Sequence, residues 1–190
     1  QRDLRRILVI RPGGMGDMIL LLPLLRRLRQ AYPAAKVDLV CERRNLDVLQ
    51  LAGLGIDAIA YDTQPFYLLR MLFRGQYDLA LDTEQFHHFS AIIAWFSRAP
   101  VRIGFKINPA RNLLYTHLVN YDGAGYEGIQ FGHLLTPLGL PEQPYALEGL
   151  LKETVLPDLT TADIRSFCDA GPYVAVYPGS STPYKNWGTA

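Results

Sequence analysis

The chain has 190 residues, of which 49% are hydrophobic and 19% charged; this composition is typical of globular proteins and excludes a disordered chain. Its length can bury one full core and the beginning of a second, which excludes two complete doubly wound domains. The net charge of +1 hides an asymmetry, because residues 1–111 carry 16 Lys and Arg against 10 Asp and Glu, whereas residues 112–190 carry 3 against 8. The basic part suits an anionic ligand or an anionic membrane surface, although a solvated arginine-rich surface has the same composition.

Short apolar runs alternate with stretches of helical periodicity over the first 105 residues. The runs predict buried strands, and the stretches between them predict helices, several of which end near Pro or Gly. This alternation predicts an α/β fold with a Rossmann-like parallel sheet, helices on both faces, and the loops after each strand along one edge. The expected strands are 7–10, 37–41, 58–61, 79–81 and 101–104, and the expected helices are 17–31, 45–52, 65–74 and 89–98.

The later part of the chain is less regular and then starts a second alternation. Residues 115–119 are a candidate strand and 129–138 a candidate helix, and the proline-rich stretch 140–157 is typical of a connector. A helix ending at Ala170 and a strand over 173–177 resemble the opening of a second Rossmann-like unit. We therefore expect one domain over 1–155, followed over 156–190 by a linker and the truncated start of a second domain.

Membrane spans and disulfides are not expected. The longest apolar run, Met18 to Leu25, has eight residues, well short of the roughly 20 that cross a bilayer. The basic first residues lead into a strand and a turn rather than into a secretory signal. Only Cys41 and Cys168 are present, so a disulfide framework or a thiolate metal site is not indicated. These features predict a cytoplasmic protein.

The segment from Ile7 to Asp17 is the most informative in the chain. It joins an apolar strand, a glycine-rich turn and a helix with a carboxylate in its first turn, which is how open α/β sheets build ligand sites at strand ends. A carboxylate about 4 Å from a phosphate charge would cost roughly 4 kcal/mol at an effective dielectric constant of about 20. Because position 19 is Ile, the dinucleotide pattern Gly-x-Gly-x-x-Gly is also broken, although Glu42 imitates its ribose-binding acid. The turn is better suited to presenting an acid.

Asp17 itself has two interpretations that the residues alone leave open. Asp is a favoured N-cap residue, worth about 1 kcal/mol to a helix. Asp17 is alternatively a general base held over a cleft. The helix dipole lowers the pKa of a carboxylate at this end, whereas an efficient base needs a pKa nearer the working pH. Partial burial against Met15, Met18 and Ile19 would offset that shift.

Two further groups of polar residues are candidates for ligand binding. The loop from Pro178 to Trp187 offers hydroxyls, backbone donors and the point charge of Lys185, which suit a diphosphate, although a solvated polar loop looks the same. His87 and His88 follow the fourth expected strand. Neighbouring residues of an extended segment point in opposite directions, so we expect one histidine to face the cleft rather than a shared metal.

Three separated segments together point to a family. The first, Ile7 to Pro23, combines a strand, a short turn, Gly16-Asp17 and a downstream proline. The second, Tyr77 to Phe105, contains Asp82, Gln85, Ser90-Ala91 and Ile103-Gly104, and the third is Tyr177 to Trp187. In this order the segments resemble glycosyltransferase family 9, the heptosyltransferases of lipopolysaccharide core assembly.

The resemblance implies a GT-B fold, in which two Rossmann-like domains face each other across a cleft. Residues 1–155 would be the acceptor-binding domain, and 156–190 the start of the domain that binds the nucleotide sugar. The family's remaining donor-binding residues would lie beyond residue 190. We therefore expect the chain to be a truncated piece that is inactive alone.

By the same resemblance, Asp17 is the catalytic base of an inverting transfer that needs neither a metal nor a cofactor. The donor is expected to be ADP-heptose, and the acceptor an anionic lipid-linked saccharide at the inner face of the bacterial inner membrane. A peripheral membrane contact is expected, and nucleic acid is not. The expected acceptor-binding residues are Gly14, Met15, Gly16, Glu84, His87 and His88, and the expected donor-binding residues are Ser180, Ser181, Lys185 and Trp187.

Two other functions remain open at this level. One is a non-catalytic carbohydrate-binding or nucleotide-binding domain that uses the same cleft. The other is a nicotinamide-dependent oxidoreductase, which would need its cofactor at Gly13 to Gly16.

Overall fold

The computed structural model describes residues 3–146, 171, 172 and 174. The chain divides into two units, Gln1–Lys152 and Glu153–Ala190, and all elements below belong to the first. The elements expected within 160–177 lie outside the described residues, as do Ser180, Ser181, Lys185 and Trp187.

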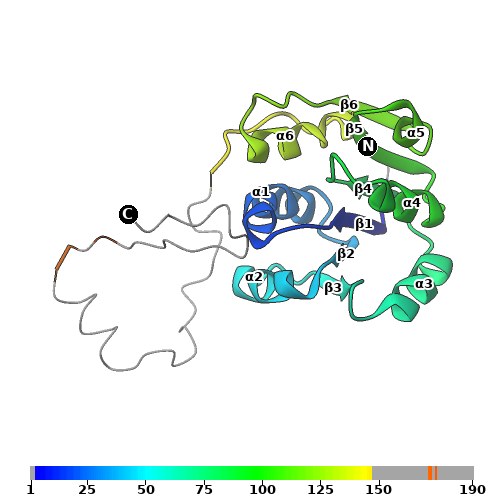
Figure 1. Ribbon diagram of the computed structural model, residues 1–190, viewed down its shortest axis with the longest axis horizontal. Helices are drawn as coiled ribbons and strands as arrows, with labels where there is room; N and C mark the ends of the chain where they lie inside the picture. Colours follow the sequence, from blue (N-terminus) through cyan, green and yellow to red (C-terminus); the bar gives the residue numbers. More distant parts are fainter. Residues whose placement is uncertain (1–2, 147–170, 173, 175–190) are drawn as a thin grey trace, which may run out of the picture. The chain divides into compact units, whose positions relative to one another are not determined.

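The described part contains a six-stranded sheet in which every neighbouring pair of strands is parallel (Figure 1). Its strand order is β3-β2-β1-β4-β5-β6, so the chain builds outward from β1 in one direction, returns, and builds outward in the other. The predicted α/β class with a parallel sheet is confirmed. The strands are β1 (Arg6–Arg11), β2 (Lys36–Cys41), β3 (Asp57–Ala60), β4 (Leu79–Asp82), β5 (Val101–Lys106) and β6 (His117–Asn120).

β1 occupies the centre of the sheet because its side chains are apolar on both faces. Ile7 and Val9 belong to one buried cluster, whereas Leu8 and Ile10 belong to the other. β1 pairs with β2 on one side and with β4 on the other, which puts Ile10 opposite Asp82. The strand order reverses between β1 and β4, and in open sheets ligands bind beyond the carboxyl ends of the strands at such a point.

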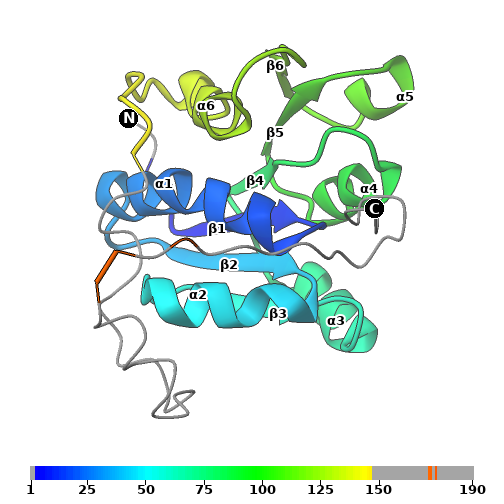
Figure 2. The same ribbon diagram turned by 60° about the vertical axis from the view of Figure 1, so that its left-hand side comes forward.

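Helices cover both faces of the sheet, as the alternation predicts (Figures 1 and 2). One buried cluster joins the sheet to α1, α2 and α6, and the other joins it to α3 and α4. In the described part of the chain no helix is both long and apolar enough to span a membrane. The helices are α1 (Met15–Ala31), α2 (Leu46–Ala52), α3 (Pro65–Arg74), α4 (His88–Phe96), α5 (Pro109–Asn112) and α6 (Glu127–His133), with short 3₁₀ turns η1 (Arg43–Asn45) and η2 (Thr136–Leu138).

Most boundaries differ from the predictions by one or two residues, and the largest difference is in α6. α1 begins two residues earlier than expected, because the extended residue Gly14 is its N-cap. The strand expected over 115–119 is β6, which begins later, at His117, and ends at Asn120. Thr116 comes directly before this strand and forms hydrogen bonds with Arg102. The candidate helix 129–138 is divided into α6 and η2.

The packing of β5 gives a test of the fold through Gly104. A Cβ added there would lie 2.5 Å from Cζ of Tyr115, whose ring occupies that space. We expect Gly104→Ala to lower the free energy of unfolding by about 1–3 kcal/mol, as overpacking typically does. Urea unfolding followed by circular dichroism measures it.

Gly132→Ala is the matched control, because a Cβ there meets no heavy atom within 4 Å. Alanine favours a helix, so this substitution in α6 should leave stability unchanged or raise it by up to about 1 kcal/mol. Equal losses in both variants would contradict the packing described at Gly104.

Candidate active site

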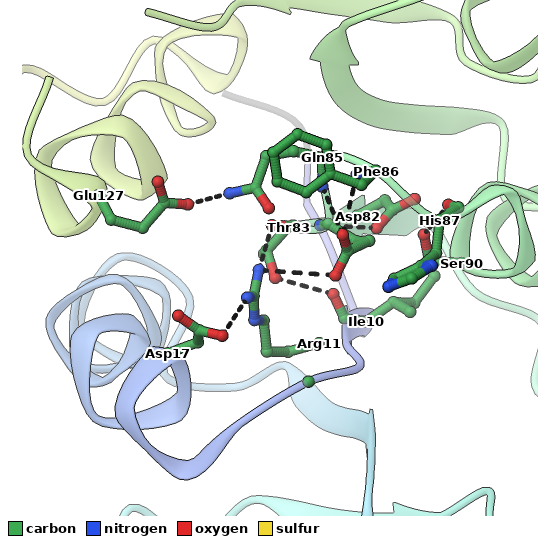
Figure 3. Close-up of polar contacts among 12 residues, drawn as sticks. Ile10, Arg11, Asp17, Asp82, Thr83, Gln85, Phe86, His87, Ser90 and Glu127 are labelled. Atoms are coloured by element: carbon green, nitrogen blue, oxygen red, sulfur yellow. Dashed lines mark hydrogen bonds and ion pairs between the residues drawn. The ribbon is translucent and has the colours of Figure 1, made fainter. Parts of the chain in front are cut away.

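A cleft of about 390 Å³ lies at the carboxyl ends of the strands, where the strand order reverses. Three loops form it: the β1–α1 turn, the β4–α4 loop and the β6–α6 loop. Figure 3 shows the Arg11 side chain between Asp17 of α1 and the loop after β4. The lining residues are Arg11, Gly13, Asp17, Glu84, Gln85, Phe86, His87, Tyr121 and Glu127.

The β1–α1 turn is anchored at Gly13, which has a φ of 116° that side chains disfavour. The Gly13 N–H donates to Oε1 of Glu42 at 3.1 Å, and Nδ2 of Asn45 donates to the Gly13 carbonyl at 3.1 Å. Glu42 also accepts a hydrogen bond from the Tyr61 hydroxyl. Glu42 therefore fixes the turn, and it occupies an N–H that a dinucleotide site would offer to a phosphate.

Asp17 is the third residue of α1 and lies on the cleft wall. Its Oδ2 is 2.8 Å from NH2 of Arg11, and 41% of its side chain is exposed. The N-cap is Gly14, which has no side chain to cap the helix, so the N-cap interpretation of Asp17 is wrong. The described residues show no hydrogen bond from a helix N–H to this carboxylate, which is held by the guanidinium instead. Met15 and Ile19, against which burial was expected, are themselves exposed.

Arg11 is the central residue of the cleft, although it is not among the site residues that the sequence predicts. It ends β1, and only 5% of its side chain is exposed. NH1 donates to the Thr83 carbonyl at 2.7 Å and lies 4.0 Å from Oε2 of Glu84, and the guanidinium lies 5.1 Å from the centre of the Phe131 ring. A buried guanidinium is retained only where such partners offset its desolvation. An arginine that directly continues a buried apolar strand was the available signal.

Glu84 and Gln85 form the opposite wall, and both are buried. Oε1 of Glu84 accepts hydrogen bonds from the N–H groups of Gln85 at 3.1 Å and Phe86 at 2.8 Å, so this oxygen shapes the loop.

The exposed His87 lines the cleft, whereas His88 is the first residue of α4 and does not line it. Of the residues predicted to bind the acceptor, Glu84 and His87 lie in the cleft lining, and Gly14, Met15, Gly16 and His88 do not.

A fully buried ion pair between Asp82 and Arg111 supports the β4–α4 loop. NH2 of Arg111 lies 3.2 Å from Oδ2 of Asp82 and donates to the Glu84 carbonyl at 2.6 Å. The Tyr115 hydroxyl donates to the same Asp82 oxygen at 2.5 Å. Burial raises the pKa of Asp82, and the contacts with Tyr115 and Arg111 counteract that rise. The Asp82–Arg111 pair therefore fixes the position of the loop that carries Glu84.

Glu127 brings a third carboxylate to the cleft from the first turn of α6. The Tyr121 hydroxyl donates to its Oε2 at 2.8 Å, and Nε2 of Gln85 donates to its Oε1. Burial raises the pKa of Glu127, the Tyr121 hydrogen bond and Arg11 lower it, and the charges of Asp17 and Glu84 raise it again. Glu127 lies 110 positions after Asp17, so no local pattern indicated that the two share a cleft.

Chemically, three carboxylates surround one buried guanidinium in an open cleft. Such an arrangement can accept a proton from a hydroxyl and can bind several hydroxyl groups at once. Within residues 3–146, 171, 172 and 174, no cluster of three His, Cys, Asp or Glu side chains is arranged to hold a metal ion.

A doubly wound parallel sheet covered by helices is the architecture of the N-terminal half of the GT-B fold, and solved structures share this fold. The crystal structure of the glycosyl transferase family 9 from Veillonella parvula matches 98% of this chain and 56% of its own, with a TM-score of 0.70 and 19% identity. Escherichia coli heptosyltransferase WaaC with ADP matches 75% of this chain and 50% of its own, with a TM-score of 0.61 and 19% identity. The predicted fold class is confirmed.

Sequence comparison gives curated relatives as well. Lipopolysaccharide heptosyltransferase 3 of Escherichia coli is 26% identical over 92% of this chain and 55% of its own length. Lipooligosaccharide heptosyltransferase 2 of Haemophilus ducreyi is 30% identical over 53% of this chain and 31% of its own length. No protein-family model matches the sequence.

These comparisons confirm the resemblance that the three segments indicate. Over the matched residues the chain is similar in sequence to lipopolysaccharide heptosyltransferases and in fold to a solved structure of glycosyltransferase family 9. The match spans about half the length of the first of those curated relatives.

The surroundings of Glu127 make its titration a test of the cleft. We expect its pKa above 4.5, because burial outweighs the hydrogen bond from Tyr121 and the charge of Arg11. Tyr121→Phe removes a donor to the carboxylate and should raise the pKa further. Because protons bind the folded state more tightly, the stability that Glu127 contributes is present at low pH and is lost as pH rises through its folded pKa.

Carbon-13 NMR of the Glu127 carboxyl measures this titration. A pKa at or below 4.5, or a decrease in Tyr121→Phe, would contradict the described surroundings. Tyr126→Phe is the control, because it changes a neighbouring tyrosine that does not line the cleft.

Proposed function

We propose that the chain is part of a glycosyltransferase that transfers heptose from ADP-heptose to a lipopolysaccharide core acceptor, with inversion at the sugar. The observation that carries the proposal is the Asp17 carboxylate, which is held in the cleft by the buried Arg11 at 2.8 Å. The names of the curated relatives support the reaction class and the acceptor class. Two solved structures of Escherichia coli heptosyltransferase WaaC contain ADP and ADP-2-deoxy-2-fluoro heptose, which supports this donor.

In the proposed mechanism Asp17 acts as a general base. Arg11 binds its Oδ2 and thereby fixes the carboxylate, which leaves Oδ1 for the acceptor hydroxyl. Asp17 takes the hydroxyl proton while the acceptor oxygen bonds to the anomeric carbon. The bond from that carbon to the diphosphate breaks on the opposite side, and ADP leaves with the electron pair.

The other cleft residues would orient the acceptor. Glu127 and Gln85 are joined by a hydrogen bond across two loops, so they hold both sides of the cleft at a fixed separation. His87 is exposed in the lining, where its imidazole can bind an anionic group of the acceptor.

The proposed donor-binding residues remain Ser180, Ser181, Lys185 and Trp187. We propose that the reaction takes place on the cytoplasmic side of the inner membrane.

Asp17→Asn tests the general base in a polypeptide of the relatives' full length. The amide keeps the shape and can still accept a hydrogen bond from Arg11, but it cannot take a proton. We expect kcat to fall by about 10²-fold or more while KM for the acceptor changes little. Steady-state kinetics with ADP-heptose and a core acceptor measure both.

Asp47→Asn is the matched control, because Asp47 lies in the first turn of α2 and does not line the cleft. Its activity should equal that of the unchanged protein. If Asp17→Asn keeps turnover within about threefold, the base assignment is wrong. Retained acceptor binding with no turnover even in the unchanged protein would favour the non-catalytic binding domain.

Lys185→Ala tests the proposed stabilisation of the leaving diphosphate without a metal. Losing one charged donor to a developing anion should lower kcat by about 10²-fold, and excess EDTA should leave the unchanged protein fully active. Lys152→Ala is the control, because it removes a lysine that lies outside the segment Tyr177 to Trp187. Inactivation by EDTA, reversed by a divalent cation, would refute a metal-free mechanism.

A further inference from the structure

The outer face of α3 and α4 exposes more large apolar side chains than any function described so far requires. Phe66 is 85% exposed and Trp95 51% exposed. Exposed apolar groups of this extent mark an interaction surface in a soluble fold. We call this set the α3–α4 surface: Phe66, Leu69 and Phe73 of α3, Ile92, Trp95 and Phe96 of α4, and the exposed Arg70, Arg74 and Arg98.

Ring contacts make the two helices one continuous surface. The rings of Phe73 and Phe96 are 6.4 Å apart, those of Trp95 and Phe96 are 5.1 Å apart, and the Arg98 guanidinium lies 5.6 Å from the centre of the Phe73 ring. Figures 1 and 2 both show α3 and α4 on the same side of the sheet. The surface therefore extends across both helices.

The fold itself does not need these outward side chains. α3 packs on the sheet through Leu68 and Leu72, and α4 through Ala91, Ile93 and Ala94. A helix whose outer face is solvated normally carries polar residues there, yet this face of α4 is apolar. The outward aromatic residues thus have a different role from the buried ones.

The charges on this surface define the occupant. The charged residues of α3 and α4 are Arg70 and Arg74, and Arg98 lies two residues after the end of α4. The connection after α3 also contains Asp78, whose Oδ2 accepts hydrogen bonds from the backbone N–H groups of Arg5 and Arg6. No Asp or Glu occurs in residues 63–77 or 85–121. Aromatic residues beside arginines, with no carboxylates, are the composition of interfacial segments that bind anionic bilayers. A protein partner with a mixed surface would be met by charges of both signs.

Further exposed aromatic residues lie between the α3–α4 surface and the cleft. Both helices start at the carboxyl ends of their strands, and α4 begins directly after the cleft residue His87. Phe86, in the cleft lining, is 70% exposed, and the Phe89 ring lies 5.3 Å from the Tyr61 ring at the start of the β3–α3 connection. An acceptor anchored in a leaflet under these helices would have its head group at the cleft.

We propose that the α3–α4 surface docks the protein on an anionic phospholipid leaflet, with the aromatic side chains at the acyl boundary and the three arginines at the phosphates. The inference rests on the proposed function in one respect, since a lipid-linked acceptor is what such docking would deliver to the cleft. Binding itself is independent of turnover.

Vesicle binding by the full chain tests the docking. We expect sedimentation with vesicles of phosphatidylglycerol and phosphatidylcholine at least tenfold stronger than with phosphatidylcholine alone, and weaker binding as salt increases. Brominated lipid should quench part of the tryptophan emission, and the quenching should disappear in Trp95→Phe. Absence of binding to the anionic vesicles overturns the proposal.

Two variants and their controls locate the docking surface. Phe73→Ser with Trp95→Ser should weaken binding at least tenfold, whereas Leu113→Ser, an 83% exposed apolar residue of the α5–β6 connection, should not. Arg70→Gln with Arg74→Gln and Arg98→Gln should weaken it on the order of 100-fold, whereas Arg5→Gln with Arg43→Gln and Lys106→Gln should weaken it far less. Circular dichroism checks that each variant is folded. Equal losses in the controls would overturn the assignment of the surface.

Two measurements separate this proposal from the proposed function. In the full-length transferase, the serine variants should lose activity on an acceptor embedded in vesicles and keep it on a deacylated, soluble acceptor. Loss on both acceptors would show that the surface serves the reaction itself and would refute the docking role. Concentration-dependent dimerisation that the serine variants abolish, without vesicle binding, would instead assign the surface to a second copy of this chain.

Discussion

The buried guanidinium of Arg11 is the interaction on which the cleft depends. It ends the central strand at the reversal of strand order, and its partners come from three places: Asp17 on α1, Thr83 after β4, and the Phe131 ring of α6. A buried cation is tolerated only when surrounding acceptors offset its lost hydration. The same contacts that stabilise Arg11 therefore set the positions of Asp17 and the β4–α4 loop.

This constraint separates two kinds of carboxylate in the site. Asp82 is fully buried and paired with Arg111, so it serves the structure of the loop. Asp17 is paired with a cation but remains 41% exposed, so one side of it is available to a substrate. Glu127 lies between these cases, because two donors hold both of its oxygens. Exposure combined with fixed orientation is what distinguishes Asp17 as the proposed base.

The two faces of the sheet are used differently. One face is covered by α1, α2 and α6, and its helices contribute Asp17 and Glu127 to the cleft. The other is covered by α3 and α4, whose outer side carries the aromatic and arginine residues of the α3–α4 surface. A single cleft at the strand ends lies within reach of both, which is how one domain can combine an acid site with a docking surface.

The sequence by itself determined the parallel sheet, its helices to within a few residues, and the place of Asp17, because these follow from local hydrophobic periodicity and glycine position. It also indicated the resemblance to glycosyltransferase family 9, through three ordered segments. Only the tertiary structure decided that Arg11 is buried, that Glu42 fixes the turn, and that Glu127 joins the cleft. Each of these depends on contacts between residues at least 29 positions apart, and no local pattern carries that information.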